Sequence, residues 1–167
     1  VIELMELVGI QQPHERYKLY PYNFSGGMRQ RLALCGAFLG QPEILMLDEP
    51  SAGLDIYERE ELKRYLCTLK QDRTVIISTH IVSDIENIAD QIILLSEGRV
   101  HACGTQQELI GRLDGKVWQI PETAEVTGHV YYSDGRRLCI ADDKPCPDAQ
   151  PKAADLTDVY FSCVKVR

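Results

Sequence analysis

The sequence lacks several features that would place it at once in a large class of proteins. No apolar run approaches the roughly 18 residues that a membrane-spanning helix requires. A basic excess is missing too, since 18 Lys and Arg stand against 25 Asp and Glu and give a formal net charge of −7. The six cysteines form no Cys-x-x-Cys pair and no histidine lies at zinc-finger spacing, so we expect buried, reduced thiols. These absences disfavour a membrane-spanning protein, a nucleic-acid binder and a zinc domain.

What the sequence does contain is apolar residues that recur at the spacings of helices and strands. The composition, 44% hydrophobic and 26% charged, is that of a globular protein with a core. Strands alternating with helices predict an α/β fold with a largely parallel sheet, and the apolar run at 44–47 predicts a strand buried on both faces. Helices are predicted at residues 1–8, 25–40, 62–69, 81–88 and in a short segment after Thr105, and strands at residues 44–47, 74–78, 91–95 and 99–103.

The pattern changes near residue 115, where helices give way to short strands. Asp134-Gly135 is a strong β-hairpin sequence between two of them. A stretch with three prolines, residues 144–154, predicts a linker before a last short helix. We therefore predict two domains: an α/β domain at 1–115 and a small β-rich accessory subdomain at 116–167.

Ser25-Gly26-Gly27 is the first of four clusters that could carry chemistry. Two glycines allow a backbone to approach a ligand closely, and they open a predicted helix whose N-terminal N–H groups favour an anion. The Ser25 hydroxyl adds a donor. The cluster is therefore a candidate phosphate contact, although the same turn is also an ordinary start of a helix.

Asp48 and Glu49 form the second cluster, at the carboxyl end of the predicted strand at 44–47. Ligands of α/β proteins bind at this end of the strands. Asp48 could hold Mg²⁺, usually through water, and Glu49 could polarise an attacking water molecule. The alternative is a pair of solvated acids at the end of a strand.

The third and fourth clusters follow along the chain. Ser51-Ala52-Gly53-Leu54-Asp55 is a glycine-containing turn, whose Asp55 could equally be a plain helix N-cap. His80 follows the predicted strand at 74–78. If the two strands are parallel neighbours, His80 lies on the same sheet edge as Asp48 and Glu49.

Together the four clusters resemble the ATP-binding cassette (ABC) ATPase family, a family of P-loop NTPases. Ser25-Gly26-Gly27 is similar to its signature motif, residues 44–49 to its Walker B strand with the glutamate that follows, residues 51–55 to its D-loop, and His80 to its switch histidine. Their order and spacing also match, over about residues 1–112. Met28 departs from the usual glutamine of the signature, and Phe24 from the commoner leucine.

The resemblance implies a mechanism as well as a fold. Two such domains, identical or different, enclose two ATP molecules, so Ser25, Gly26 and Gly27 would contact the γ-phosphate of an ATP held by the partner domain. Asp48 would bind Mg²⁺, and Asp55 would link the two sites. Glu49 and His80 would act on the attacking water and the γ-phosphate. A transmembrane permease would be the further partner, which implies a position on the cytoplasmic face of the membrane.

One motif of the family is missing from these residues, because no Gly-x-x-x-x-Gly-Lys-Ser/Thr phosphate loop (Walker A) occurs in them. We therefore expect the C-terminal portion of an ABC ATPase domain, inactive alone. The segments at 98–109 and 156–160 resemble ATPases of ABC-2-type exporters, which implies export. Two alternatives stay open: a soluble ABC ATPase acting on ribosomes or DNA, and a non-catalytic interaction module.

Overall fold

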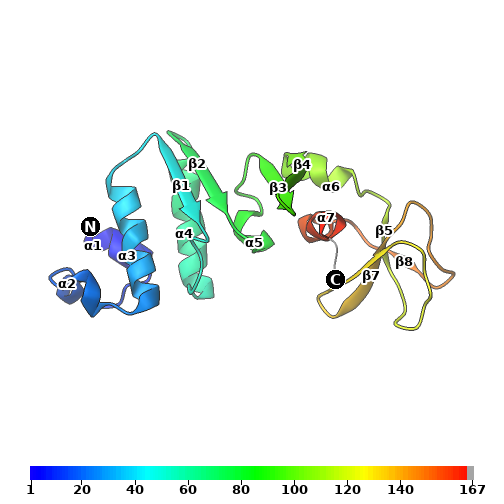
Figure 1. Cartoon of the computed structure of the whole chain (residues 1–167), viewed down its shortest axis with the longest axis horizontal. Helices are drawn as coiled ribbons and strands as arrows, with labels where there is room; N and C mark the ends of the chain where they lie inside the picture. Colours follow the sequence, from blue (N-terminus) through cyan, green and yellow to red (C-terminus); the bar gives the residue numbers. More distant parts are fainter. Residues whose placement is uncertain (165–167) are drawn as a thin grey trace. The chain divides into compact units, whose positions relative to one another are not determined.

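The structure is a computed structural model that describes residues 1–164, and the chain divides into two compact units (Figure 1). The first runs from Val1 to Asp84 and the second begins at Ile85. This division falls earlier than the predicted domain boundary at 115. The reason is that the last helix of the chain packs against a strand at 92–96 and joins that region to the accessory strands.

The first unit contains helices on a two-stranded parallel sheet. Strand β1 pairs in parallel with β2, and their register aligns Ile44 with Thr74 and Asp48 with Ser78. The two carboxyl ends therefore lie side by side. The elements are α1 (Ile2–Leu7), α2 (Pro13–Arg16), η1 (Pro21–Asn23), α3 (Gly26–Leu39), β1 (Ile44–Asp48), α4 (Ile56–Leu69), β2 (Thr74–Ser78) and the short α5 (Val82–Ile85), which ends at the start of the second unit.

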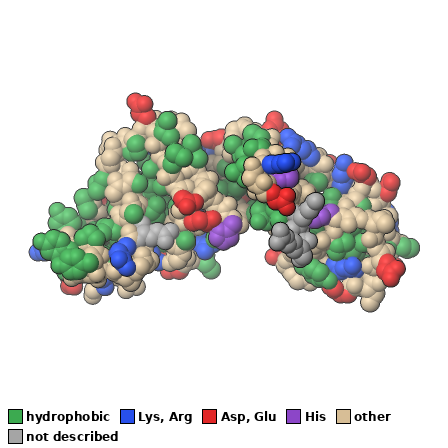
Figure 2. Space-filling view, in the orientation of Figure 1, with side chains coloured by type: hydrophobic (Ala, Val, Ile, Leu, Met, Phe, Trp, Pro, Cys, Tyr) green, Lys and Arg blue, Asp and Glu red, His purple; other side chains and the backbone are tan. Residues whose placement is uncertain are grey.

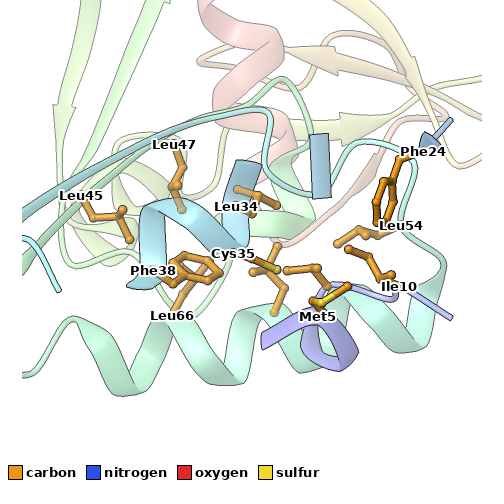
Figure 3. Close-up of a cluster of buried hydrophobic side chains, with 12 residues drawn as sticks. Met5, Ile10, Phe24, Leu34, Cys35, Phe38, Leu45, Leu47, Leu54 and Leu66 are labelled. Carbon is orange, nitrogen blue, oxygen red and sulfur yellow. The ribbon is translucent and has the colours of Figure 1, made fainter. Parts of the chain in front are cut away.

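The core of this unit lies between the sheet and its helices (Figure 3). Leu45 and Leu47 point into it from β1, where they join side chains such as Phe38 of α3 and Leu66 of α4. The alternate residues Ile44 and Met46 are 60% and 73% exposed. The prediction of a strand buried on both faces is therefore wrong, because within the described residues only one face of β1 is covered.

The second unit is mainly antiparallel. Strands β3 and β4 form a two-stranded sheet, and four further strands form a sheet in the order β6-β7-β5-β8. The predicted hairpin at Asp134-Gly135 is confirmed, with both residues at positive φ between β6 and β7. The elements are β3 (Ile92–Ser96), β4 (Arg99–Gly104), α6 (Gln106–Gly111), β5 (Val117–Gln119), β6 (His129–Ser133), β7 (Arg136–Ile140), β8 (Gln150–Pro151) and α7 (Leu156–Cys163).

Three sequence expectations are corrected by this arrangement. The sheet is not largely parallel, because β1–β2 is the one parallel pair among the described strands. The predicted linker contains β8, whose Pro151 is tolerated because β8 is the last strand of its sheet. The helix predicted at 81–88 shortens to α5. Across residues 1–164 no helix combines the length and apolarity needed to cross a membrane.

Candidate functional site

The carboxyl ends of β1 and β2 bring together most of the predicted polar cluster. Asp48 ends β1 and accepts a hydrogen bond on Oδ1 from the hydroxyl of Ser78, its partner in register. The Glu49 N–H donates to the Ser78 carbonyl at 2.9 Å, which extends the parallel ladder by one residue. Acidic side chains and a histidine lie next to one another near these strand ends (Figure 2).

Glu49 and His80 form a hydrogen-bonded pair in this cluster. Glu49 Oε1 lies 2.7 Å from His80 Nδ1 and accepts from the His80 backbone N–H at 3.0 Å. The Thr79 hydroxyl donates to Glu49 Oε2 at 3.3 Å. The hydrogen bond with the His80 side chain holds the pKa of the Glu49 carboxyl below its ordinary value of 4.5, although partial burial opposes this shift. The carboxylate is therefore ionised at neutral pH.

Backbone geometry fixes where this carboxylate points. Glu49 has φ of 45°, a left-handed conformation that non-glycine residues seldom adopt. The chain turns there, directly after β1, and then enters the turn at 51–55. Unusual backbone conformations of this kind are concentrated at functional sites.

Asp55 lies at the end of this turn and begins α4. Its carboxylate accepts from the Glu58 N–H at 2.9 Å, while Glu58 accepts from the Asp55 N–H at 3.0 Å, a complete capping box. The N-cap reading of Asp55 is thus confirmed. Its predicted link between two ATP sites stays a prediction.

Ser25 and the two glycines lie at the N-terminus of α3. Ser25 is the N-cap and accepts from the Met28 N–H at 3.4 Å. A Cβ added to Gly26 or Gly27 would meet open space, and neither residue has a positive φ. Packing within the described residues therefore does not require glycine at either position. Close approach by a ligand from outside would explain both.

The sequence reasoning missed a buried carboxylate that supports the 51–55 turn. Asp84 is buried and accepts a hydrogen bond from the hydroxyl of Ser51, which is itself buried. Arg59 of α4 lies 3.8 Å from the other Asp84 oxygen. A single Asp within a helix as short as α5 gives no periodic pattern, so the sequence contains no signal that would predict its burial.

Comparisons with known proteins find that the chain is similar to ATP-binding proteins of ABC transporters. The family model described as "ABC transporter" matches residues 1–52. The chain is 35% identical to the dipeptide transport ATP-binding protein DppD of Bacillus subtilis over 65% of the chain and 33% of that protein. It is 32% identical to the sulfate/thiosulfate import ATP-binding protein CysA of Brucella melitensis over 98% of the chain and 48% of that protein.

Solved structures agree with the sequence matches. A structure titled as the ATP binding subunit of an ABC transporter superposes with a TM-score of 0.58 at 30% identity, covering 66% of this chain and 45% of the other. A bacterial Atm1-family ABC exporter with ATP bound gives 0.54 over 66% of this chain and 21% of the other, and at 24% identity this likeness shows the fold alone. Over the part of the chain that superposes, the fold is that of an ABC ATPase nucleotide-binding domain, a P-loop NTPase fold.

The resemblance stated from the motifs is therefore confirmed: the chain is related to the ATP-binding proteins of ABC transporters. The chain spans between about a third and a half of the length of the curated relatives reported above.

Proposed function

We propose that this chain forms part of the ATP-binding subunit of an ABC transporter, and that the complete domain hydrolyses ATP. The observation that carries the proposal is the cluster of Asp48, Glu49 and His80 at one sheet edge, where Glu49 lies 2.7 Å from His80. Relatives named as transport ATP-binding proteins support it. Because the chain covers only part of their length, the activity is proposed for the whole domain.

Glu49 would orient or deprotonate the attacking water. Its ionised carboxylate can accept a proton, and the bonds from His80 and Thr79 fix its direction. His80 follows the end of β2, the neighbouring strand, where its exposed ring could contact the γ-phosphate. Both groups are held before a ligand arrives, which reduces the reorganisation that catalysis requires.

The residues present fit ATP and Mg²⁺ in part. Asp48 would hold Mg²⁺, which prefers oxygen ligands and retains several waters, so a single carboxylate at a strand end is an adequate protein ligand. When bound, the ion supplies charge neutralisation to the phosphates. No group of three or more His, Cys, Asp or Glu that could hold a metal ion occurs in residues 1–164.

The signature turn, Ser25 to Gly27, would contact the γ-phosphate of an ATP bound to a second ABC domain. Its glycines are exposed and their Cα atoms face open space, as contact with an outside ligand requires. Asp55 would link the two sites across the pair of domains. A transmembrane permease would complete the assembly and hold the subunit on the cytoplasmic face of the membrane.

The direction of transport is a finer proposal with two candidates. Export is predicted from the segments at 98–109 and 156–160. Import is the second candidate, and the observation that favours it is the alignment with the sulfate/thiosulfate import protein over 98% of this chain. Uptake and efflux of labelled substrate in vesicles that contain the assembled transporter would separate the two.

Replacing Glu49 tests the proposed chemistry in the complete ATPase. Glu49→Gln should retain ATP binding but lose hydrolysis by about 100-fold or more, because the water loses its acceptor while Asp48 remains. Glu43→Gln, an exposed acid just before β1, is the matched control and should hydrolyse ATP normally. Normal turnover in Glu49→Gln would remove Glu49 from the mechanism.

A further inference from the structure

Arg31 of α3 connects three segments of the first unit through one guanidinium group. Its Nη1 donates to the Gly9 carbonyl at 2.6 Å and to Glu58 Oε1 at 3.0 Å. Its Nη2 donates to the carbonyl of Gly53, inside the 51–55 turn. The side chains of Arg31 and Glu58 are only 17% and 18% exposed. Ion pairs shielded to this extent are screened less by water than surface pairs are.

Glu58 uses both of its carboxylate oxygens in the same cluster. Oε1 accepts from Arg31, and Oε2 accepts from the Asp55 N–H at 3.0 Å. Arg31 therefore reaches the 51–55 turn in two ways: directly at the Gly53 carbonyl, and through Glu58 at Asp55. We call Gly9, Arg31, Gly53 and Glu58 the arginine clamp.

Gly9 shows that the clamp is closely fitted. A Cβ at Gly9 would lie 1.8 Å from Glu58 Oε1 and 2.7 Å from Arg31 Nη1, closer than atoms can approach. Gly9 also has φ of 70°, which favours glycine. Both the space and the backbone at this position are thus shaped around the ion pair.

Arg31 lies on the same helix as the signature turn, since α3 begins at Gly26 and runs to Leu39. A helix of this length is a largely rigid element, so a displacement of its N-terminus would be carried to Arg31. The planar fork of arginine holds two acceptors in fixed directions, which a lysine cannot do. The guanidinium is thus a hydrogen-bonded connection between α3 and the 51–55 turn.

We propose that Arg31 is a positioning residue that couples the signature turn at Ser25–Gly27 to the 51–55 turn through the arginine clamp. This inference rests on the proposed function, in which both turns belong to the nucleotide site. Arg31 touches no nucleotide in this role. Its effect on turnover passes through Gly53 and Asp55.

The first test measures backbone amide exchange in the 167-residue chain by nuclear magnetic resonance. The Ala52 and Leu54 amides donate within the turn, to Glu49 and Ser51 respectively. In Arg31→Gln we expect both to exchange about tenfold faster, because a charge-assisted hydrogen bond to the turn is lost. The Glu49 amide, which bonds β2, should keep its rate.

Matched controls separate the clamp from a general effect of charge. Arg64 and Glu61 form a 2.7 Å pair on the surface of α4, so Arg64→Gln makes the same substitution without touching the turn. It should leave exchange at Ala52 and Leu54 within about twofold of the parent chain. Equal exchange in Arg31→Gln and Arg64→Gln would overturn the proposal.

A double variant tests whether Arg31 and Glu58 act as one unit. Glu58→Gln can still accept from the Asp55 N–H, but its amide group no longer matches the guanidinium. If the two residues work together, combining both substitutions should accelerate exchange little beyond Arg31→Gln alone. Additive effects of the two substitutions would contradict coupling. Should Arg31→Gln unfold the unit, Arg31→Lys takes its place, and unchanged exchange at Ala52 and Leu54 in that variant would also refute the clamp.

A kinetic readout distinguishes positioning from mere stabilisation. In the complete ATPase, Arg31→Lys should lower kcat about tenfold and leave KM for ATP within about twofold, because Arg31 itself touches no nucleotide. A raised KM with unchanged kcat would refute the positioning role. The exchange experiment requires no nucleotide, so its failure is distinguishable from failure of the proposed function, which the Glu49→Gln experiment tests separately.

Discussion

The Lys152→Met substitution should strongly destabilise the second unit, because it leaves a buried carboxylate without its cation. Asp158 is fully buried and accepts from Lys152 Nζ at 2.7 Å, from the Tyr131 hydroxyl at 2.7 Å and from the Asp155 N–H at 2.8 Å. Removal of one partner from a buried ion pair costs about 3–5 kcal/mol, since the other charge stays buried and uncompensated.

The size of the effect can be read from urea unfolding. Trp118 is the only tryptophan of the chain and lies in β5, so its fluorescence reports on the second unit alone. For a small unit with an m value of about 1 kcal/mol/M, a loss of about 3 kcal/mol lowers the urea midpoint by about 3 M. Methionine has a similar length, so little packing is lost.

A surface ion pair in the same unit supplies the control. Lys116 and Asp142 lie 2.8 Å apart but are 43% and 84% exposed, so Lys116→Met should cost less than about 1 kcal/mol. If Lys152→Met shifts the midpoint no further than Lys116→Met does, the buried pair contributes nothing and the reasoning fails.

Three further predictions concern the core, the cysteines and pH. Leu138→Ala, at a fully buried position of β7, should destabilise the second unit by about 2–5 kcal/mol in the same urea assay. Burial raises the pKa of Cys35 to about 11, so at pH 8 a thiol reagent should label exposed Cys103 and spare Cys35; equal rates would contradict this. Partial burial by itself would lower the pKa of Lys152 and raise that of Asp155. Hydrogen bonds outweigh burial: those to Asp155 and Asp158 raise the pKa of Lys152 above 10.5, and those from Lys152 and from backbone N–H groups lower the pKa of Asp155 below 3.8. The ion pair should therefore lose its stabilising effect as pH rises through the pKa of Lys152 or falls through the pKa of Asp155. In the urea assay, the unfolding midpoint should decrease at both extremes of pH.

The regular elements of the fold were largely predictable from sequence, because each leaves a local pattern. The strand at 74–78 has the predicted bounds. Ser25 is the N-cap of α3, as the sequence predicted. Thr105 forms the predicted capping box with Glu108. What the apolar run at 44–47 could not reveal is which of its faces is covered, since that depends on which helices pack against it.

The candidate site was predictable where it follows strand ends. Asp48, Glu49 and His80 were expected at one sheet edge, and the parallel register of β1 and β2 brings them there. The arginine clamp was not predictable, because Arg31 and Glu58 are far apart in sequence and charged pairs at that separation leave no periodic pattern. The functional roles of Asp48, Glu49 and His80, like those of Ser25–Gly27 and Asp55, stay predictions.

Whether these residues can hold a nucleotide without a phosphate loop can be measured by titrating the 167-residue chain with Mg-ATP in a calorimeter. In the proposed function these residues would contribute the signature turn, Asp48, Glu49 and His80 to an ABC ATPase site, but they contain no phosphate loop. We expect no detectable binding of Mg-ATP by the chain alone. Binding at micromolar concentration would contradict this expectation, since the described residues would then hold the phosphates without the loop.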